Sequence, residues 1–425
     1  MHGDELHEEE IEKANHFTWN LRVNVCVESF WGFAMALIST ATIIPVFLSK
    51  LGASERMIAL VPGITLVGWA SLQLPSAYYT TRLRRKMGPV VWLHVPIVLL
   101  WMGAALVARD LAATRPDVAR WLFLVLMGAA YVVGSIAIPM WADFLNRQTP
   151  ASKRGRFLAW MFAAASCFAL LGGIVAQRIL DHFEFPLGFA ICFFVAACCM
   201  MVGLLPYMLV REVAMEPTRF ESARVFARHI WSIVRSRGGL KRLVVTRCLM
   251  ESGIMAGAFY AVNAMDVAHL PLRTAATFTI ITTAATAPMT LLAGYVGERW
   301  GFRIVLVFAG LFGAAATALA LLGGGTIWFY VMFAMVGLAV ACDLSATMNM
   351  VIEMSPDRDK TVYQAIYNTM LMPMRIAYPL LAGWLAAERG MATLFAVALA
   401  LQLCGAVAAA VVVREPRKNA GVGEQ

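Results

Sequence analysis

The chain has 425 residues, of which 60% are hydrophobic and only 14% are charged, and its formal net charge is +9. Its mean hydropathy is +0.70. These values lie far outside the averages of soluble domains, so they exclude a soluble multidomain protein and predict an integral membrane protein.

Apolar segments follow one another along almost the whole chain. Read in windows of about 19 residues, the sequence contains about twelve runs long enough to cross the ~30 Å hydrocarbon core of a bilayer. They fall into two sets of six, which predicts an all-α membrane protein with twelve transmembrane helices. The expected spans are 20–47, 57–80, 88–108, 120–146, 157–179, 186–210, 243–266, 272–298, 302–323, 326–354, 361–386 and 390–413.

The distribution of basic residues predicts the orientation of these spans. If the N-terminus is cytoplasmic, the inner segments hold 25 of the 35 Lys and Arg and the outer segments hold 8. Basic residues near span ends favour the cytoplasmic side, so both termini are expected there, in a bacterial-type inner membrane. The expected parts are an acidic cytoplasmic tail (1–19), a six-helix bundle (20–210), a basic linker (211–242), a second bundle (243–413) and a cytoplasmic tail (414–425).

The remaining charges and the cysteines argue against a signal peptide, a nucleic-acid partner, a metal site and disulfides. The acidic start of the chain has the wrong sign for a signal peptide, and we expect a mobile tail. The linker places Phe220, Phe226, Ile230 and Ile233 at near-helical spacing among arginines, which predicts an amphipathic helix on the inner leaflet. Anionic lipid is therefore the expected partner of the basic charge, and nucleic acid is not, because the charges are scattered among separate loops. The eight cysteines lie inside spans without metal-ligand spacing, so neither a metal nor a disulfide is expected.

The two halves of the chain resemble each other. Asn24, Glu28 and Ser29 in the first span have the same spacing as Arg247, Glu251 and Ser252 in the seventh. Loops after the second and eighth spans, and after the fourth and tenth, also match at similar offsets. Together these matches indicate duplication of a six-span unit.

One loop motif resembles that of a known family. The Major Facilitator Superfamily usually has Gly-x-x-x-Asp-Arg-x-Gly-Arg-Arg between two spans, and the loop after the eighth span here is similar to it. The residues that carry the resemblance are Gly294, Gly297, Glu298, Arg299, Gly301 and Arg303, together with the run Pro150 to Arg156 in an earlier loop. The first-half copy departs from the motif at Ala77, Thr81 and Arg84. The gating residues implied by the resemblance are Gly294, Glu298, Arg299, Gly301 and Arg303, with Arg82, Arg85 and Arg154 in the first half.

The resemblance implies a central cavity lined by spans 1, 4, 7 and 10, with spans 3, 6, 9 and 12 outside it. The deep ionisable residues agree, because such groups are costly in hydrocarbon unless they face a cavity or each other. They are Glu28, Arg247, Glu251, Asp343 and Arg375, and none lies on span 3, 6, 9 or 12. Polar residues at helical spacing extend these faces, so the candidate substrate residues are Glu28, Gln73, Asp343, Asn368, Arg375 and Tyr378.

Each candidate has a structural alternative. Arg375 could bind a substrate anion through its planar guanidinium, or it could form a permanent pair with Asp343. Glu28, Glu251 and Asp343 are candidates for proton coupling, because desolvation favours a protonated carboxyl group. Arg247 could instead neutralise Glu251 one turn away. The threonines of span 272–298 could line a cavity or form hydrogen bonds between helices.

These patterns predict a secondary active transporter that moves a small organic solute across the inner membrane by alternating access, coupled to protons. The alternatives are a multidrug-type efflux antiporter and a transport-inactive sensor or assembly protein of the same fold. No nucleophile–base pair, metal-ligand cluster or phosphate-binding loop was found in the sequence, so no enzyme activity and no cofactor are expected. A small-molecule substrate and a monomer are expected.

Overall fold

We describe a computed structural model that covers residues 2–80, 82–150, 153–214, 222–236, 238–355 and 360–415. Within these ranges the chain is almost entirely helical and contains no strand, as the sequence predicts. Eleven of the described helices or helix pairs are long and apolar enough to cross a membrane. The remaining expected span corresponds to α1 (His2–Leu37) and α2 (Ile43–Lys50).

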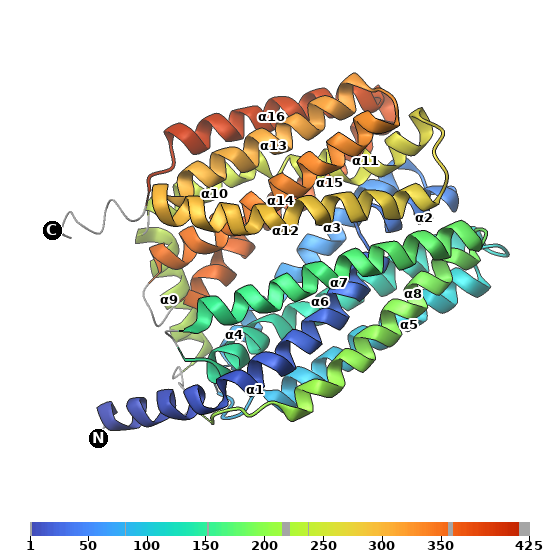
Figure 1. Ribbon diagram of the computed structural model, residues 1–425. Helices are drawn as coiled ribbons and strands as arrows, with labels where there is room; N and C mark the ends of the chain where they lie inside the picture. The colour runs from blue at the N-terminus through green and yellow to red at the C-terminus, as the bar shows by residue number, and fades with distance from the viewer. Residues whose placement is uncertain are drawn as a thin grey trace. The chain divides into compact units, whose positions relative to one another are not determined.

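The helices form two compact units, which Figure 1 labels along the chain. Unit 1 comprises 1–38 and 68–226, and unit 2 comprises 39–67 and 227–425. Residues 39–67, expected in the first bundle, therefore share more contacts with the second. Unit 1 holds α1, α4 (Gln73–Thr80), α5 (Met87–Asp110), α6 (Pro116–Gln148), α7 (Arg154–His182), α8 (Leu187–Leu204) and the 3₁₀ helix η2 (Leu205–Leu209).

Two helices have residues in both units: α3 (Glu55–Ser71) and α9 (Ala223–Ser236). The rest of unit 2 is formed by α2, α10 (Gly238–Met250), α11 (Gly253–Val267), α12 (Arg273–Trp300), α13 (Phe302–Leu322), α14 (Thr326–Met354), α15 (Lys360–Arg389) and α16 (Met391–Val411).

The amino-terminal segment is helical in the structure. Helix α1 begins at His2 and continues into the first span. Phe17 is buried in a cluster with Leu145, Phe157 and Met161 of α6 and α7. This contact packs the part of α1 around Phe17 against α6 and α7.

Three of the predicted spans are interrupted along their length. The first breaks at 38–42, the second at Leu72 and the seventh at Glu251 and Ser252. Pro45 and Pro75 lack the N–H that would bond the carbonyl four residues earlier, which accounts for the first two breaks. The Leu72 N–H is donated instead to Ser135 Oγ, at 3.1 Å.

Close packing between helices depends on glycine. A Cβ built on Gly32 of α1 would lie 2.1 Å from the Ala165 carbonyl oxygen of α7, and one on Gly337 of α14 would lie 2.4 Å from the Thr282 carbonyl oxygen of α12. Such backbone approach is typical of membrane helices. The threonines of α12 take part: Thr282 and Thr286 donate to backbone carbonyls of α14 at 3.3 and 3.1 Å. This favours the interhelical alternative for these threonines.

Helix α9 confirms the helical pattern of the linker. Phe226 and Ile233 are buried, and the ring of Phe226 lies 5.6 Å from that of Tyr78. Trp231, on the other face, is 66% exposed. The apolar face expected to lie on lipid is thus covered by protein, while Phe220 lies outside the described residues.

Candidate functional site

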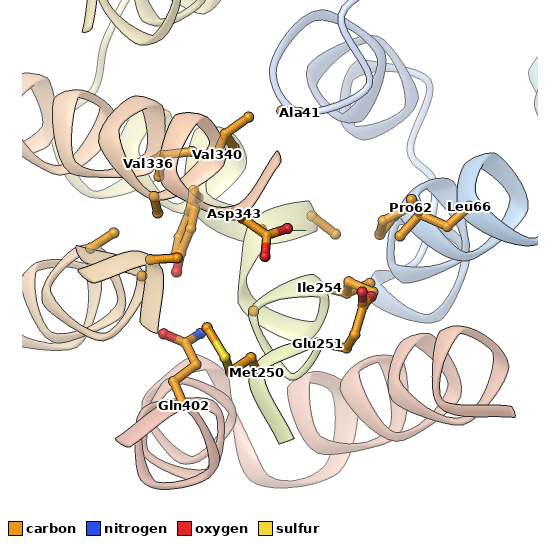
Figure 2. Close-up of a pocket in the computed structure, with 18 of the residues that line it drawn as sticks. Ala41, Pro62, Leu66, Met250, Glu251, Ile254, Val336, Val340, Asp343 and Gln402 are labelled. Carbon is orange, nitrogen blue, oxygen red and sulfur yellow. The ribbon is translucent and has the colours of Figure 1, made fainter. Parts of the chain in front are cut away.

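Unit 2 contains a cavity of about 420 Å³ with charged residues on its wall (Figure 2). This volume lies within the usual range of small-molecule sites. Most of the wall is apolar, from Leu66, Met250, Ile254, Val336 and Val340. Its charged residues are Arg247, Glu251, Asp343 and Arg375.

The four charged residues form an alternating chain of ion pairs. Arg247 Nη1 lies 2.7 Å from Asp343 Oδ1, and Arg247 Nη2 lies 2.9 Å from Glu251 Oε1. Arg375 Nη2 donates to the same Glu251 oxygen at 3.3 Å. Two acids and two bases cancel in sum, and this pairing allows charges to remain away from bulk water.

The break between α10 and α11 positions the centre of this chain. Arg247 lies on the last full turn of α10, and Glu251 lies in the break itself. The Ile254 N–H donates to the Glu251 carbonyl at 2.9 Å, a tighter i to i+3 bond than the α-helical one. Broken helices at membrane depth are tolerated where they border a cavity, and they commonly occur at transporter binding sites.

Two tyrosines of α15 hold the network from the side. Tyr367 Oη accepts a hydrogen bond from Arg247 Nε at 3.1 Å, and Tyr378 Oη donates to the Cys248 carbonyl at 2.8 Å. Tyr378, predicted as a substrate residue, therefore contacts the α10 backbone. Neither tyrosine is among the residues that line the cavity.

The expected Asp343–Arg375 pair is not the one that forms. Arg247 takes both oxygens of Asp343, with its Nη2 also 3.0 Å from Oδ2, and Arg375 faces Glu251 instead. Depth along a helix can be counted from the sequence, but it cannot distinguish two bases on neighbouring helices. Asp343 is the most accessible of the four, with 33% of its side chain exposed.

Two helices that the resemblance places outside the central cavity line this cavity of unit 2. Ala309, Gly310, Gly313 and Ala316 of α13 and Gln402 of α16 line this cavity. These helices are the ninth and twelfth spans, which were expected to lie outside the central cavity. Small residues on α13 let the cavity extend inside the second bundle.

The other predicted substrate residues do not line this cavity. Glu28 and Gln73 belong to unit 1. Glu28 is half-buried on α1, and no hydrogen bond or ion pair to it is found within the described ranges. Gln73 is buried and donates to the Trp69 carbonyl at 2.8 Å. Asn368 is half-buried on α15 but is not part of the lining.

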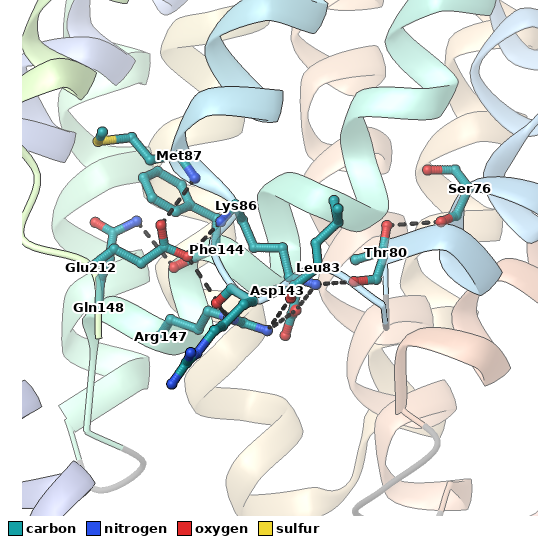
Figure 3. A network of polar contacts seen from close by, with 11 residues as sticks. Ser76, Thr80, Leu83, Lys86, Met87, Asp143, Phe144, Arg147, Gln148 and Glu212 are labelled. Atoms are coloured by element: carbon teal, nitrogen blue, oxygen red, sulfur yellow. Dashed lines mark hydrogen bonds and ion pairs between the residues drawn. The ribbon is translucent and has the colours of Figure 1, made fainter. Parts of the chain in front are cut away.

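A second charged network ties together one end of unit 1 (Figure 3). Lys86 is fully buried, and its Nζ lies 2.7 Å from Asp143 Oδ2 on α6. Glu212 accepts from the backbone N–H groups of Lys86 and Met87 at 2.7 and 3.0 Å, at the start of α5. Burial lowers the pKa of Lys86, while the neighbouring Asp143 carboxylate opposes that shift.

Arg147 joins the same network to the loop before α5. It donates to Asp143 Oδ2 at 3.3 Å and to the Leu83 and Arg84 carbonyls. The first-half loop lacks the acidic residue of the motif, and Asp143 of α6 supplies an acidic contact to this loop through Lys86. The sequence did not single out Lys86, Arg147 and Glu212 as a group.

The predicted gating residues of the second half cluster where α12 meets α13. Gly301 has φ +99°, a conformation that glycine adopts readily, and a Cβ there would lie 2.3 Å from Glu415 Oε2. The Arg303 N–H donates to that same oxygen at 3.0 Å. Arg299 contacts the Tyr295 hydroxyl at 3.1 Å and the ring of Trp300. Gly294 and Glu298 lie on the last turns of α12.

Two of the corresponding arginines of the first half are exposed, like Arg299 and Arg303. Arg82 stacks over the Tyr78 ring at 4.3 Å, and Arg85 is exposed. Arg154 begins α7, but its side chain lies outside the described residues.

One cavity residue, Gln402, had no counterpart in the sequence prediction, and a second, Arg247, has more partners than expected. Gln402 is an uncharged amide in an otherwise apolar helix, and a search limited to ionisable groups passes over it. Arg247 was considered only as a partner of Glu251, although it contacts both acids. A search of the apolar spans for buried amides would have found Gln402.

A family model identifies the class to which the chain belongs. The Major Facilitator Superfamily model matches residues 29–286 and 269–425, so the chain is a member of this superfamily of multi-pass membrane transport proteins. No curated protein matches the sequence closely enough to count as a relative.

Solved structures agree on the fold. The chain is similar to a POT family transporter in complex with 5-aminolevulinic acid, at 12% identity and TM-score 0.73, covering 92% of this chain and 95% of that one. It is also similar to a D-xylose-proton symporter, at 14% identity and TM-score 0.69, with 93% and 98% covered. A nucleoside transporter matches at 13% identity and TM-score 0.67, with 92% and 99% covered. At such identities the likeness concerns the fold alone.

Proposed function

We propose that the protein is a secondary active transporter that moves a small organic solute across a bacterial-type inner membrane by alternating access, coupled to protons. The observation that carries the proposal is the cavity of unit 2, where a chain of four charges, three of them buried, crosses a broken helix. Structural stability alone does not call for such a chain, because apolar residues of similar volume often serve a protein interior equally well. A site that must bind polar solutes does call for it.

Asp343 and Glu28 have different roles in this proposal. Asp343 is the carboxylate most accessible from the cavity, and it meets the solute. Glu28 has no ion-pair partner within the described ranges, so a proton can come and go without breaking a pair. The solved neighbours include peptide, sugar and nucleoside transporters, one of them a proton symporter, which supports this solute class and this coupling.

The mostly apolar wall favours one other function, efflux of amphipathic molecules in exchange for protons. The direction of the driving gradient separates the two functions. A proton symporter accumulates solute on the side of the membrane opposite the acidic one, because solute and protons move in the same direction. A proton antiporter accumulates solute on the acidic side, because the two move in opposite directions.

Counterflow in proteoliposomes tests the proposal directly. Vesicles loaded with one unlabelled solute are diluted into the same labelled solute, with dipeptides, 5-aminolevulinate, xylose, nucleosides and amphipathic amines each tried in turn. We expect transient accumulation of at least one class, abolished in Asp343→Asn. Absence of counterflow for every class, with correctly inserted protein, would favour a sensor or assembly protein of the same fold.

A further inference from the structure

The cavity of unit 2 extends sideways between α11, α13 and α16. Glycines of two helices make this space: a Cβ built on Gly253 would lie 3.3 Å from Gln402 Nε2, and one on Gly313 would lie 3.4 Å from Gln402 Oε1. A Cβ on Gly257, one turn further along α11, would meet no heavy atom within 4 Å. The amide of Gln402 thus packs against the backbone at Gly253 and Gly313, and the open room lies one turn along α11, at Gly257.

The amide of Gln402 is only partly satisfied. The residue is 2% exposed, and its Oε1 accepts a hydrogen bond from Thr317 Oγ1 at 3.1 Å. Thr317 in turn lies 2.6 Å from Tyr260 Oη. Gln402 Nε2 has no hydrogen-bond partner in the part of the chain that is described.

An unpaired buried amide is costly to a protein. Leaving a buried donor without a partner costs the desolvation of that group, which an apolar residue at this position would avoid. The opposite end of the amide is fixed by the Thr317–Tyr260 pair, so the free end stays directed at the cavity wall (Figure 2). Such a group is suited to a ligand that arrives and leaves.

We propose that the space between α11, α13 and α16 is a subsite that binds an uncharged hydrogen-bonding group of the transported solute, such as a hydroxyl or a carboxamide, through Gln402. The inference rests on the proposed transport function for the nature of the occupant. Its chemistry follows from the surroundings: Gln402, Thr317 and Tyr260 are uncharged, and the adjoining α13 wall consists of Gly and Ala. A charged group would have no counter-ion in this part of the cavity, so it belongs at Asp343.

The solute class that follows is bifunctional. One end carries a group that pairs with the Asp343 carboxylate, such as an amine, and the other carries a neutral hydroxyl or carboxamide. The apolar wall contributed by Met250 and Ile254 lies between these ends. Simple alkyl amines would satisfy only half of the site.

The subsite is tested without knowledge of the solute by thiol chemistry at Gly257→Cys. The probes are 2-hydroxyethyl and ethyl methanethiosulfonate, which differ by one hydroxyl; the thiolate attacks the reagent sulfur, a disulfide forms and methanesulfinate leaves. The rate is read at residue 257 by peptide mass spectrometry on full-length purified protein, so the native cysteines can remain. We expect the hydroxyethyl reagent to react faster than the ethyl reagent. In Gln402→Leu this ratio should fall roughly three- to tenfold, the effect of one hydrogen bond.

Val340→Cys is the matched control, because Val340 lines the same cavity on α14 and is 49% exposed. There the ratio of the two rates should not respond to Gln402→Leu. Gln402→Met, similar in length to glutamine, repeats the test if the leucine variant does not elute as a single species. Two results would overturn the subsite. One is a Gly257→Cys thiol that does not react although Val340→Cys does, and the other is a ratio of the two rates at residue 257 that is the same with Gln402 and in Gln402→Leu. Because no step requires transport, these results are independent of whether solute flux is found.

Discussion

At the scale of single residues, the main result is how the buried charges pair. Helix periodicity predicted which acids and bases lie deep in the bilayer, because polar residues at helical spacing mark one face. It could not predict the partners, which depend on how α10, α14 and α15 are rotated against one another. Arg247 therefore replaces Arg375 as the partner of Asp343.

The observed ion pairs predict different stabilities for two double variants that have the same net charge. Arg247→Gln removes the partner of two acids, and breaking a buried pair in this way costs about 3–5 kcal/mol of stability. Asp343→Asn with Arg247→Gln leaves the Glu251–Arg375 pair intact and should recover most of that loss. Arg247→Gln with Glu251→Gln leaves Asp343 and Arg375 without partners and should not recover it.

Thermal unfolding in detergent checks the three variants against wild type. All the double variants have the same net charge as wild type, so only the geometry distinguishes them. Equal recovery in both double variants would contradict the observed pairing, and recovery confined to Arg247→Gln with Glu251→Gln would favour the Asp343–Arg375 pair that the sequence suggested.

Glu28 provides a second prediction at this scale. Glu28→Gln mimics the protonated acid, so it should retain solute exchange across equilibrated membranes but lose accumulation driven by a pH gradient. Labelled solute exchange and gradient-driven uptake are measured on the same vesicles. If Glu28→Gln still accumulates solute at the wild-type level, Glu28 is not the coupling site.

At the scale of elements, the spans were predictable and their interruptions were not. A run of about 20 apolar residues has few alternatives in a membrane, because every backbone polar group must be satisfied within the segment. The breaks at Leu72 and Glu251 depend on individual hydrogen bonds. The bond from the Leu72 N–H to Ser135 Oγ, for example, joins residues that are far apart in the sequence. The proline signals were visible in the sequence, but proline occurs inside continuous helices here as well.

The Lys86 network gives a pH prediction for the start of α5. The pKa of Lys86 is lowered from 10.5 by burial, so the unfolded chain binds more protons than the folded one between the two pKa values. Stability therefore rises with pH through that alkaline window. In Lys86→Met this rise should be smaller, which is measured as the melting temperature against pH for both proteins. Identical slopes would show that Lys86 does not titrate differently on folding.

The loop between α12 and α13 gives the last element-scale prediction. Arg299 contacts the Tyr295 hydroxyl and the Trp300 ring, so Arg299→Ala should lower turnover by altering the end of α12 while insertion stays normal. Arg303→Ala removes the side chain of a second motif residue but keeps the contact to Glu415, which uses the backbone N–H of residue 303. Wild-type turnover in a well-inserted Arg299→Ala protein would remove Arg299 from the gate.

At the scale of the whole molecule, membership of the Major Facilitator Superfamily and the charged cavity of unit 2 lead to the same proposal. Sequence reasoning reached the class because hydropathy and the loop motif are local signals. It did not predict that α13 and α16 line a cavity, since their small residues read as ordinary helix-packing positions. The lateral extension at Gln402 is a property of three helices together.

The most direct test of the central claim is solute uptake into proteoliposomes with an imposed pH gradient. Wild-type protein should accumulate a labelled solute above its equilibrium level, and a protonophore should abolish the accumulation while leaving exchange intact. Asp343→Asn should lose both. Uptake that ignores the gradient, or wild-type uptake in Asp343→Asn, would contradict proton-coupled transport through this cavity.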